Sequence, residues 1–167
     1  MACSNRIPKR PVRTRDEDTE RSKISLTATP TPTILLIDDN AVQAATRQTI
    51  LKRAGYFVIA VLNPQRALEQ FRNNEFSDEI DLVITDHVMP GMNGSVFVHS
   101  LRELNPSLPV LVISGLEEAE PEYIGMRVTF RLKPLLPEDL LANVHELIRG
   151  RQPTQAKPVH REGRTGS

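Results

Sequence analysis

Residues 81–94 read Asp-Leu-Val-Ile-Thr-Asp-His-Val-Met-Pro-Gly-Met-Asn-Gly, and this stretch decides the fold. Its apolar run, 82–84, is short and continuous rather than alternating, which is typical of a parallel strand buried on both faces. After Thr85 the run leads to a carboxylate, Asp86. The stretch therefore predicts a buried strand that delivers an acidic side chain to the edge of a sheet.

Similar aliphatic runs occur on both sides of this stretch, at 34–37, 56–61 and 110–113, with a weaker one at 128–132 that Arg131 interrupts. Helical patterns lie between the runs, at 40–54, after Asn63-Pro64, around 97–104 and at 137–150. Strand and helix thus alternate about five times between residues 33 and 150. This alternation predicts an α/β fold with a doubly wound parallel sheet.

The formal net charge of the chain is zero, with 21 basic and 21 acidic residues, but the charge is unevenly distributed. Residues 33–150 are acidic overall, whereas residues 1–32 and 151–167 are basic and have little that is apolar to bury. Segments of that kind cannot offset the entropy of ordering. We therefore expect one folded domain at 33–150 between a disordered N-terminal extension, 1–32, and a disordered basic tail, 151–167.

Composition excludes several classes of protein. The only cysteine is Cys3, so a disulfide scaffold is excluded. No apolar run approaches the roughly 20 residues that a membrane-spanning helix needs. The N-terminus carries charge without an apolar stretch behind it, which does not fit a secretory signal. A cytoplasmic protein without a membrane partner is the expectation.

Polar side chains follow the predicted strands at matching positions. These are Asp38 and Asp39 after the first run, Asp86 after the third, Ser114 after the fourth, and Lys133 after the fifth. Ligands of open α/β sheets bind beyond the carboxyl ends of the strands. A single Asp there is more simply a helix cap, but five such residues at one edge predict a site.

The residue types of this predicted site indicate its chemistry. Clustered carboxylates repel one another and need a cation, and hard oxygen ligands without His or Cys favour Mg²⁺. A pocket that holds Mg²⁺ and a Lys suits a phosphoryl group. No Gly-rich phosphate loop is present, which argues against a nucleotide. The remaining interpretation is that a carboxylate itself accepts the phosphoryl group.

Four motifs carry a resemblance to a known family: Ile37-Asp38-Asp39-Asn40, the stretch 81–94, Val112-Ile113-Ser114 and 130–134, Phe-Arg-Leu-Lys-Pro. In this order they resemble the receiver domain of two-component response regulators over residues 33–150. The resemblance implies a flavodoxin-like five-stranded sheet in the order 2-1-3-4-5.

The resemblance also assigns roles to individual residues. Asp86 would accept the phosphoryl group, Lys133 would pair with it, and Ser114 would donate its hydroxyl to it. Asp39, Asp86 and the backbone carbonyl of Val88 would ligate Mg²⁺, with Asp38 acting through a bound water. Phe130 would be the aromatic side chain that changes rotamer on activation.

Some positions depart from the pattern of the family. Between Ser114 and Lys133 the chain is short, and Pro121 lies in an acidic stretch, so the fourth helix is expected to be short or irregular. Val88 and Leu116 are apolar where rapidly dephosphorylating receivers carry polar groups that orient water. Slow self-dephosphorylation is therefore expected. His87 is expected to point away from the side of Asp86, without a functional role.

The function that these patterns favour is that of a signalling phosphoacceptor rather than an enzyme. A histidine kinase or a histidine phosphotransfer protein would supply the phosphoryl group, and output would pass through an unknown downstream protein. The alternative is a transcription-linked regulator whose basic tails contact nucleic acid. Nucleic acid is the less favoured partner, because no base-reading element is visible. The sequence does not identify the kinase, the stimulus or the oligomeric state.

Overall fold

The structure is a computed structural model that describes residues 30–151. The predicted tails at 1–32 and 151–167 lie almost entirely outside the described residues. Within the described part, five parallel strands form one sheet: β1 (Thr33–Ile37), β2 (Phe57–Val61), β3 (Leu82–Asp86), β4 (Val110–Ser114) and β5 (Thr129–Leu132). Their order is β2-β1-β3-β4-β5, which confirms the predicted topology.

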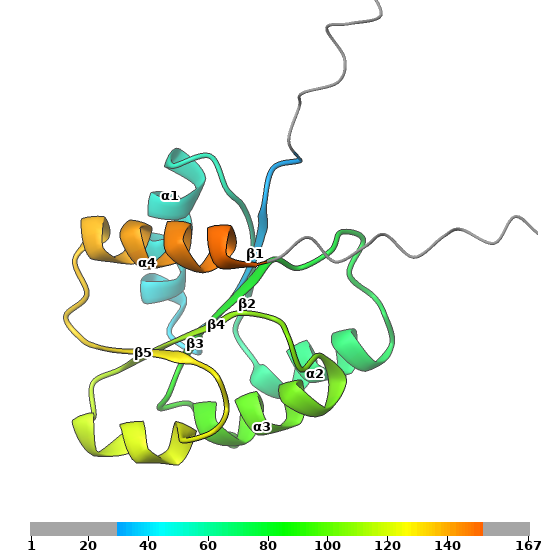
Figure 1. The fold of residues 1–167 in the computed structure, drawn as a ribbon, viewed down its shortest axis with the longest axis vertical. Coiled ribbons are helices and arrows are strands. Elements are labelled where there is room, and N and C mark those ends of the chain that lie inside the picture. Colours follow the sequence, from blue (N-terminus) through cyan, green and yellow to red (C-terminus); the bar gives the residue numbers. More distant parts are fainter. Residues whose placement is uncertain (1–29, 152–167) are drawn as a thin grey trace, which may run out of the picture. The chain divides into compact units, whose positions relative to one another are not determined.

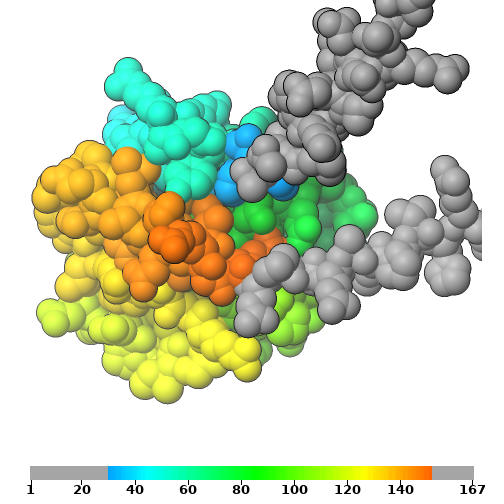
Figure 2. Space-filling view, turned by 45° about the horizontal axis from the view of Figure 1, so that its top comes forward, coloured from blue at the N-terminus to red at the C-terminus, as the bar shows by residue number. Residues whose placement is uncertain are grey.

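Helices cover both faces of this sheet (Figure 1). On one face lie α1 (Ala41–Arg53) and α4 (Pro137–Gly150), which contact each other and are seen side by side in Figure 2 in cyan and orange. On the other face lie α2 (Pro64–Arg72), α3 (Gly94–Leu104) and the 3-10 helix η1 (Glu117–Tyr123). The fold is therefore a three-layer α/β sandwich.

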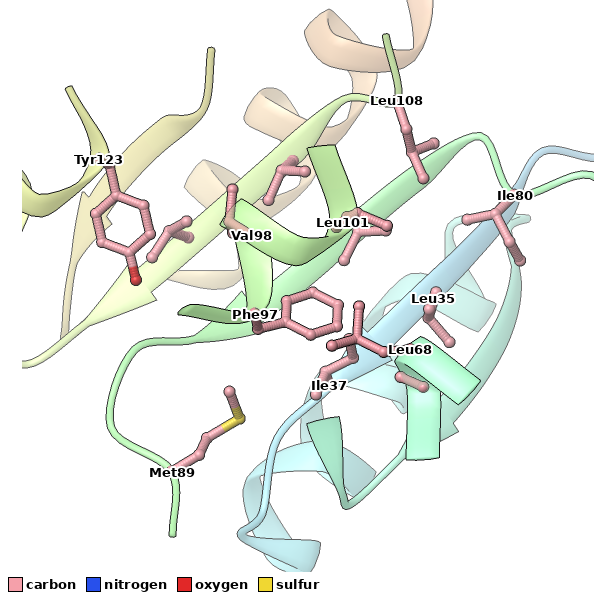
Figure 3. Close-up of a cluster of buried hydrophobic side chains, with 14 residues drawn as sticks. Leu35, Ile37, Leu68, Ile80, Met89, Phe97, Val98, Leu101, Leu108 and Tyr123 are labelled. Atoms are coloured by element: carbon pink, nitrogen blue, oxygen red, sulfur yellow. The ribbon is translucent and has the colours of Figure 1, made fainter. Parts of the chain in front are cut away.

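Each face of the sheet has its own apolar core. On the α2/α3 face, Phe97 and Leu101 of α3 pack with Leu68 of α2 against Leu35 and Ile37 of β1 (Figure 3). On the other face, apolar residues of α1 and α4 cover the remaining strand side chains, which include Ile34, Leu36, Ile84 and Leu111. Both faces of the central strands are thus buried, which explains their continuous apolarity.

Asparagine side chains begin the first three helices. Asn40, Asn63 and Asn93 each accept hydrogen bonds from backbone N–H groups in the first turn. These N–H groups have no partner within the helix, so the caps satisfy donors that would otherwise be left without one. At α4 the N-cap residue is Leu136, and it makes no side-chain capping bond.

The fourth helical element is short, as the sequence predicts. Residues Glu117–Tyr123 form a 3-10 helix with Pro121 inside it, and Ala119 and Tyr123 are its buried residues. Pro removes a backbone donor and restricts its neighbour, so a regular α-helix is disfavoured here. No helix of the described part is long and apolar enough to span a membrane.

Candidate functional site

The carboxyl ends of three adjacent strands bring the predicted site residues together. Asp38 directly follows β1, Asp86 ends β3 and Ser114 ends β4, and these strands are neighbours in the sheet. Lys133 follows β5, and its backbone N–H donates to the Ser114 carbonyl at 2.7 Å. The sheet therefore places two carboxylates, a hydroxyl and an ammonium group at one edge.

Asp86 and Lys133 form a direct ion pair. The Lys133 ammonium contacts Asp86 Oδ2, and the Asp86 side chain is only 6% exposed. Oδ1 of Asp86 lies 3.4 Å from the backbone N–H of Val88, which is a weak contact. Lys133 is thus the main group that neutralises the buried negative charge of Asp86.

Asp38 is completely buried and has a cation of its own. Its Oδ1 accepts from the backbone N–H of Asn40 at 2.9 Å, and its Oδ2 contacts the Arg47 guanidinium. Burial raises the pKa of the Asp38 carboxyl above its usual value, and the Asn40 N–H and Arg47 offset this only in part. Breaking a buried ion pair by removing one partner typically costs about 3–5 kcal/mol.

Gln43 connects the two ion pairs. Its Oε1 accepts from the Lys133 ammonium at 3.1 Å and from Nη2 of Arg47 at 3.2 Å. Gln43 and Arg47 are four residues apart in α1, so they share one face of that helix. The first turns of α1 therefore contribute two side chains to the site.

The predicted metal ligands are only partly assembled. Asp39 is exposed and makes no side-chain hydrogen bond or ion pair with any described residue, and Val88 is exposed as well. Among residues 30–151 no group of three or more His, Cys, Asp or Glu lies close enough to hold a metal ion. Asp38 and Asp86 are buried, whereas Asp39 is exposed, and the Mg²⁺ ligand set stays a prediction.

The chemistry of the donors nevertheless fits Mg²⁺. Asp38, Asp39, Asp86 and the Val88 carbonyl offer only hard oxygen ligands, which Mg²⁺ prefers. The two buried carboxylates also require positive charge, which Lys133 and Arg47 now provide. When bound, Mg²⁺ would neutralise charge on the oxygens of a transferred phosphoryl group.

The side chains of Ser114 and Phe130, which the resemblance links to activation, contact neighbouring residues rather than Asp86. The Ser114 hydroxyl donates to the Leu116 carbonyl at 3.1 Å and accepts from the Leu116 N–H at 2.9 Å, so it bonds to its own loop rather than to Asp86. The Phe130 ring is half-buried and lies 5.6 Å from the Tyr123 ring, centroid to centroid. Both side chains are thus held by local contacts.

His87 takes part in a buried network that the sequence does not reveal. Its Nδ1 lies 2.7 Å from the Tyr123 hydroxyl, and the two rings meet edge to face. Burial raises the pKa of the Tyr123 hydroxyl well above its usual value, with the charges of Glu122 and Asp86 adding to the effect. The network joins the residue after Asp86 to the Phe130 ring, which Tyr123 also contacts.

Arg47, Gln43 and Tyr123 are the residues of this region that the sequence-based reasoning missed. Helix α1 has no strong apolar stripe, so its sequence pattern does not predict which face it turns toward the sheet. The positions of Gln43 and Arg47 therefore could not be predicted. The spacing of four between Gln43 and Arg47 was the available signal. Tyr123 lies in an irregular element whose orientation no periodicity predicts.

Comparison with known proteins places residues 34–145 in a family. They match the family model described as the response regulator receiver domain. The putative two-component response regulator ARR21 of Arabidopsis thaliana is 36% identical over 108 residues, which are 64% of this chain and 17% of that protein. The autoinducer 1 sensor kinase/phosphatase LuxN of Vibrio harveyi is 36% identical over 103 residues, 61% of this chain and 12% of that protein. The chain thus spans less than a fifth of either relative.

Solved structures show the same fold. A response regulator receiver protein from Sinorhizobium medicae WSM419 has a TM-score of 0.64 and 28% identity, covering 74% of this chain and 98% of that one. A CheY-like receiver domain protein from Methanospirillum hungatei JF-1, at 21% identity and a TM-score of 0.65, covers 71% of this chain and 94% of that one, and supports the fold alone. The family match, the strand order and the acidic edge of the sheet agree, and the chain belongs to the response regulator receiver domain family.

Proposed function

We propose that the chain accepts a phosphoryl group on Asp86 from a phosphohistidine of a histidine kinase or a histidine phosphotransfer protein. The observation that carries this proposal is the buried Asp86 carboxylate at the end of β3 in contact with the Lys133 ammonium. An oxygen of Asp86 attacks phosphorus, a new O–P bond forms, and the P–N bond to the donor histidine breaks. Asp38, Asp39, Asp86 and the Val88 carbonyl would hold Mg²⁺ during this step.

The roles of the other side chains follow from charge. Phosphoryl transfer depends mainly on positioning and on stabilising charge, which Lys133 is placed to supply. A phosphoryl group on Asp86 adds roughly one negative charge. We expect this charge to draw the Ser114 hydroxyl from the Leu116 backbone toward Asp86, and Phe130 to change rotamer in response. Output would then pass to a downstream protein through the altered surface.

The assignment of Asp86 can be tested by phosphorylating the full chain with acetyl phosphate in the presence of Mg²⁺. We expect intact-mass analysis to show one added phosphoryl group, removable by hydroxylamine as an acyl phosphate should be. Asp86→Asn should abolish the addition, whereas the matched control Asp78→Asn should retain it, because Asp78 is exposed and lies before the start of β3, at the opposite end of that strand from Asp86. Equal labelling of wild type and Asp86→Asn would refute the assignment of Asp86.

A long lifetime of the phosphorylated state is part of this proposal, with no catalytic activity beyond self-phosphorylation and slow self-dephosphorylation. Val88 and Leu116 are apolar, 57% and 41% exposed, and offer no side-chain hydrogen bond to an attacking water. Replacing both by Asn should speed loss of the phosphoryl group by about tenfold or more. A half-life of seconds for the phosphorylated wild type would contradict the proposal.

The cytoplasmic setting and the nucleic-acid alternative stay predictions. The basic tails on which the alternative depends lie almost wholly outside residues 30–151, so no contact in the structure supports it. Salt-dependent retention of the full chain on DNA would favour that alternative over signalling through a protein partner alone.

A further inference from the structure

Two cations already contact the buried carboxylates that the family uses to hold its metal. Lys133 contacts Asp86, the phosphoacceptor of the proposed function, and Arg47 contacts Asp38. Lys133 is one of the residues implied by the family motif, but Arg47 is not. Its presence at a predicted metal ligand is a feature of this chain that the motif does not explain.

The contacts of Arg47 show a side chain held in place rather than one lying loosely on the surface. Asp38 is fully buried, and the Arg47 side chain is only 14% exposed. Nη2 of Arg47 donates to Gln43 Oε1 at 3.2 Å, so a second residue of α1 orients the guanidinium. Among the described residues Arg47 has no other carboxylate partner, and Asp38 has no other cation in direct contact. The two charges therefore depend on each other.

Gln43 links the position of Arg47 to that of Lys133. One oxygen, Gln43 Oε1, accepts hydrogen bonds from both cations. If Arg47 leaves, Gln43 loses one of its two donors and retains Lys133. Departure of Arg47 thus leaves Asp38 without its ion pair, while Lys133 keeps its contacts with Gln43 and Asp86.

We propose that Arg47 is a resident counter-ion that competes with Mg²⁺ for Asp38 and so sets the Mg²⁺ concentration at which the site can accept a phosphoryl group. This inference rests on the proposed function, because it assumes that Asp38 takes part in binding the metal. A divalent ion and a guanidinium cannot both lie against Asp38 without strong repulsion. Entry of Mg²⁺ therefore requires Arg47 to move out toward solvent, at the cost of its ion pair.

The test measures Mg²⁺ binding to the full chain by isothermal titration calorimetry, without any phosphodonor. We expect Arg47→Gln to bind Mg²⁺ about tenfold more tightly than wild type, because no ion pair has to be broken. Arg47→Lys keeps the positive charge, so its affinity for Mg²⁺ should be closer to that of wild type. Arg53→Gln removes an equal charge from the exposed last turn of α1 and should leave the affinity unchanged. Unchanged or weaker binding by Arg47→Gln would overturn the proposal.

Thermal unfolding provides a second readout that does not depend on activity. Without Mg²⁺, Arg47→Gln should unfold at a lower temperature than wild type, because Asp38 then lacks its counter-ion. Mg²⁺ should raise the unfolding temperature of Arg47→Gln more than that of wild type, and equal shifts would speak against competition. If Arg47→Gln does not fold without Mg²⁺, the neutral pair Asp38→Asn/Arg47→Gln should fold, and its failure to do so would also count against the role of Arg47 as counter-ion.

Failure of this inference is distinguishable from failure of the proposed function. If Arg47→Gln and wild type bind Mg²⁺ equally and Asp86 is still phosphorylated, the role of Arg47 is wrong and the function stands. If neither protein binds Mg²⁺ and Asp86 is not phosphorylated, both are wrong.

Discussion

At the scale of single residues, close packing around Asp86 constrains the loop that follows β3. A Cβ atom at Gly94 would lie 2.5 Å from the Tyr123 hydroxyl, 2.6 Å from the Asp86 carbonyl oxygen and 2.9 Å from His87 Cα. Two of these neighbours are backbone atoms, which cannot turn aside. Only glycine therefore allows α3 to begin this close to Asp86.

We expect Gly94→Ala to lower the free energy of unfolding by about 1–3 kcal/mol, because the loop or the helix must shift to admit the methyl group. Urea denaturation measures this loss. Gly115→Ala is the matched control, since a Cβ atom there meets nothing within 4 Å. Equal stability of the two variants would show that the contact around Gly94 relaxes at no cost.

At the scale of elements, α4 begins without the side-chain cap that α1, α2 and α3 have. Leu136 is its N-cap residue, is 52% exposed and makes no capping bond. Pro137 at the start of the helix removes one donor, and Glu138 and Asp139 complement the positive end of the helix. The remaining free N–H groups of the first turn would still gain from an acceptor.

Replacing Leu136 by Ser should therefore stabilise the domain by about 1 kcal/mol, because the hydroxyl can accept from the first turn of α4. Leu136→Ala is the control, since it removes the same apolar side chain without adding an acceptor. A higher urea midpoint for the Ser variant than for the Ala variant is the expected outcome. If the Ser variant is the less stable of the two, a hydroxyl at position 136 does not stabilise the start of α4.

At the scale of the whole domain, Arg151 connects the end of α4 to the starts of two strands of the sheet. Its guanidinium donates to Asp81 Oδ1 at 2.6 Å and to the Ile80 carbonyl at 3.0 Å, and it also contacts Glu79. Asp81 in turn accepts from the Thr33 N–H at 2.8 Å. One side chain thus connects α4 with the beginnings of β3 and β1, although residue 151 is where the basic tail was predicted to start.

Arg151→Ala should lower the free energy of unfolding by about 1 kcal/mol, because it removes charged hydrogen bonds that are partly shielded from water. Arg149→Ala is the control, since Arg149 is exposed and makes no ion pair with any described residue. Thermal or urea unfolding of both variants measures the difference. If the two variants are equally stable, the contacts of Arg151 contribute nothing in solution.

The sequence was sufficient for the order of elements and for most of the acidic edge. Strand positions follow from continuous apolar runs, because both faces of a parallel sheet are covered by helices. The runs also give the ends of the strands, and hence place Asp38, Asp86, Ser114 and Lys133 at one edge. The irregular fourth element follows from Pro121 and from the short chain available.

The sequence does not predict which side chains contact one another at the carboxyl ends of the strands. These contacts depend on how each helix is rotated relative to the sheet. The Arg47–Asp38 pair and the Gln43 bridge require a particular rotation of α1, and no strong apolar stripe in that helix predicts it. For the same reason the sequence does not predict the exposure of Asp39 or the hydrogen bond between His87 and Tyr123. Local pattern determines which residues reach the edge of the sheet, whereas the packing of whole elements determines which of them meet.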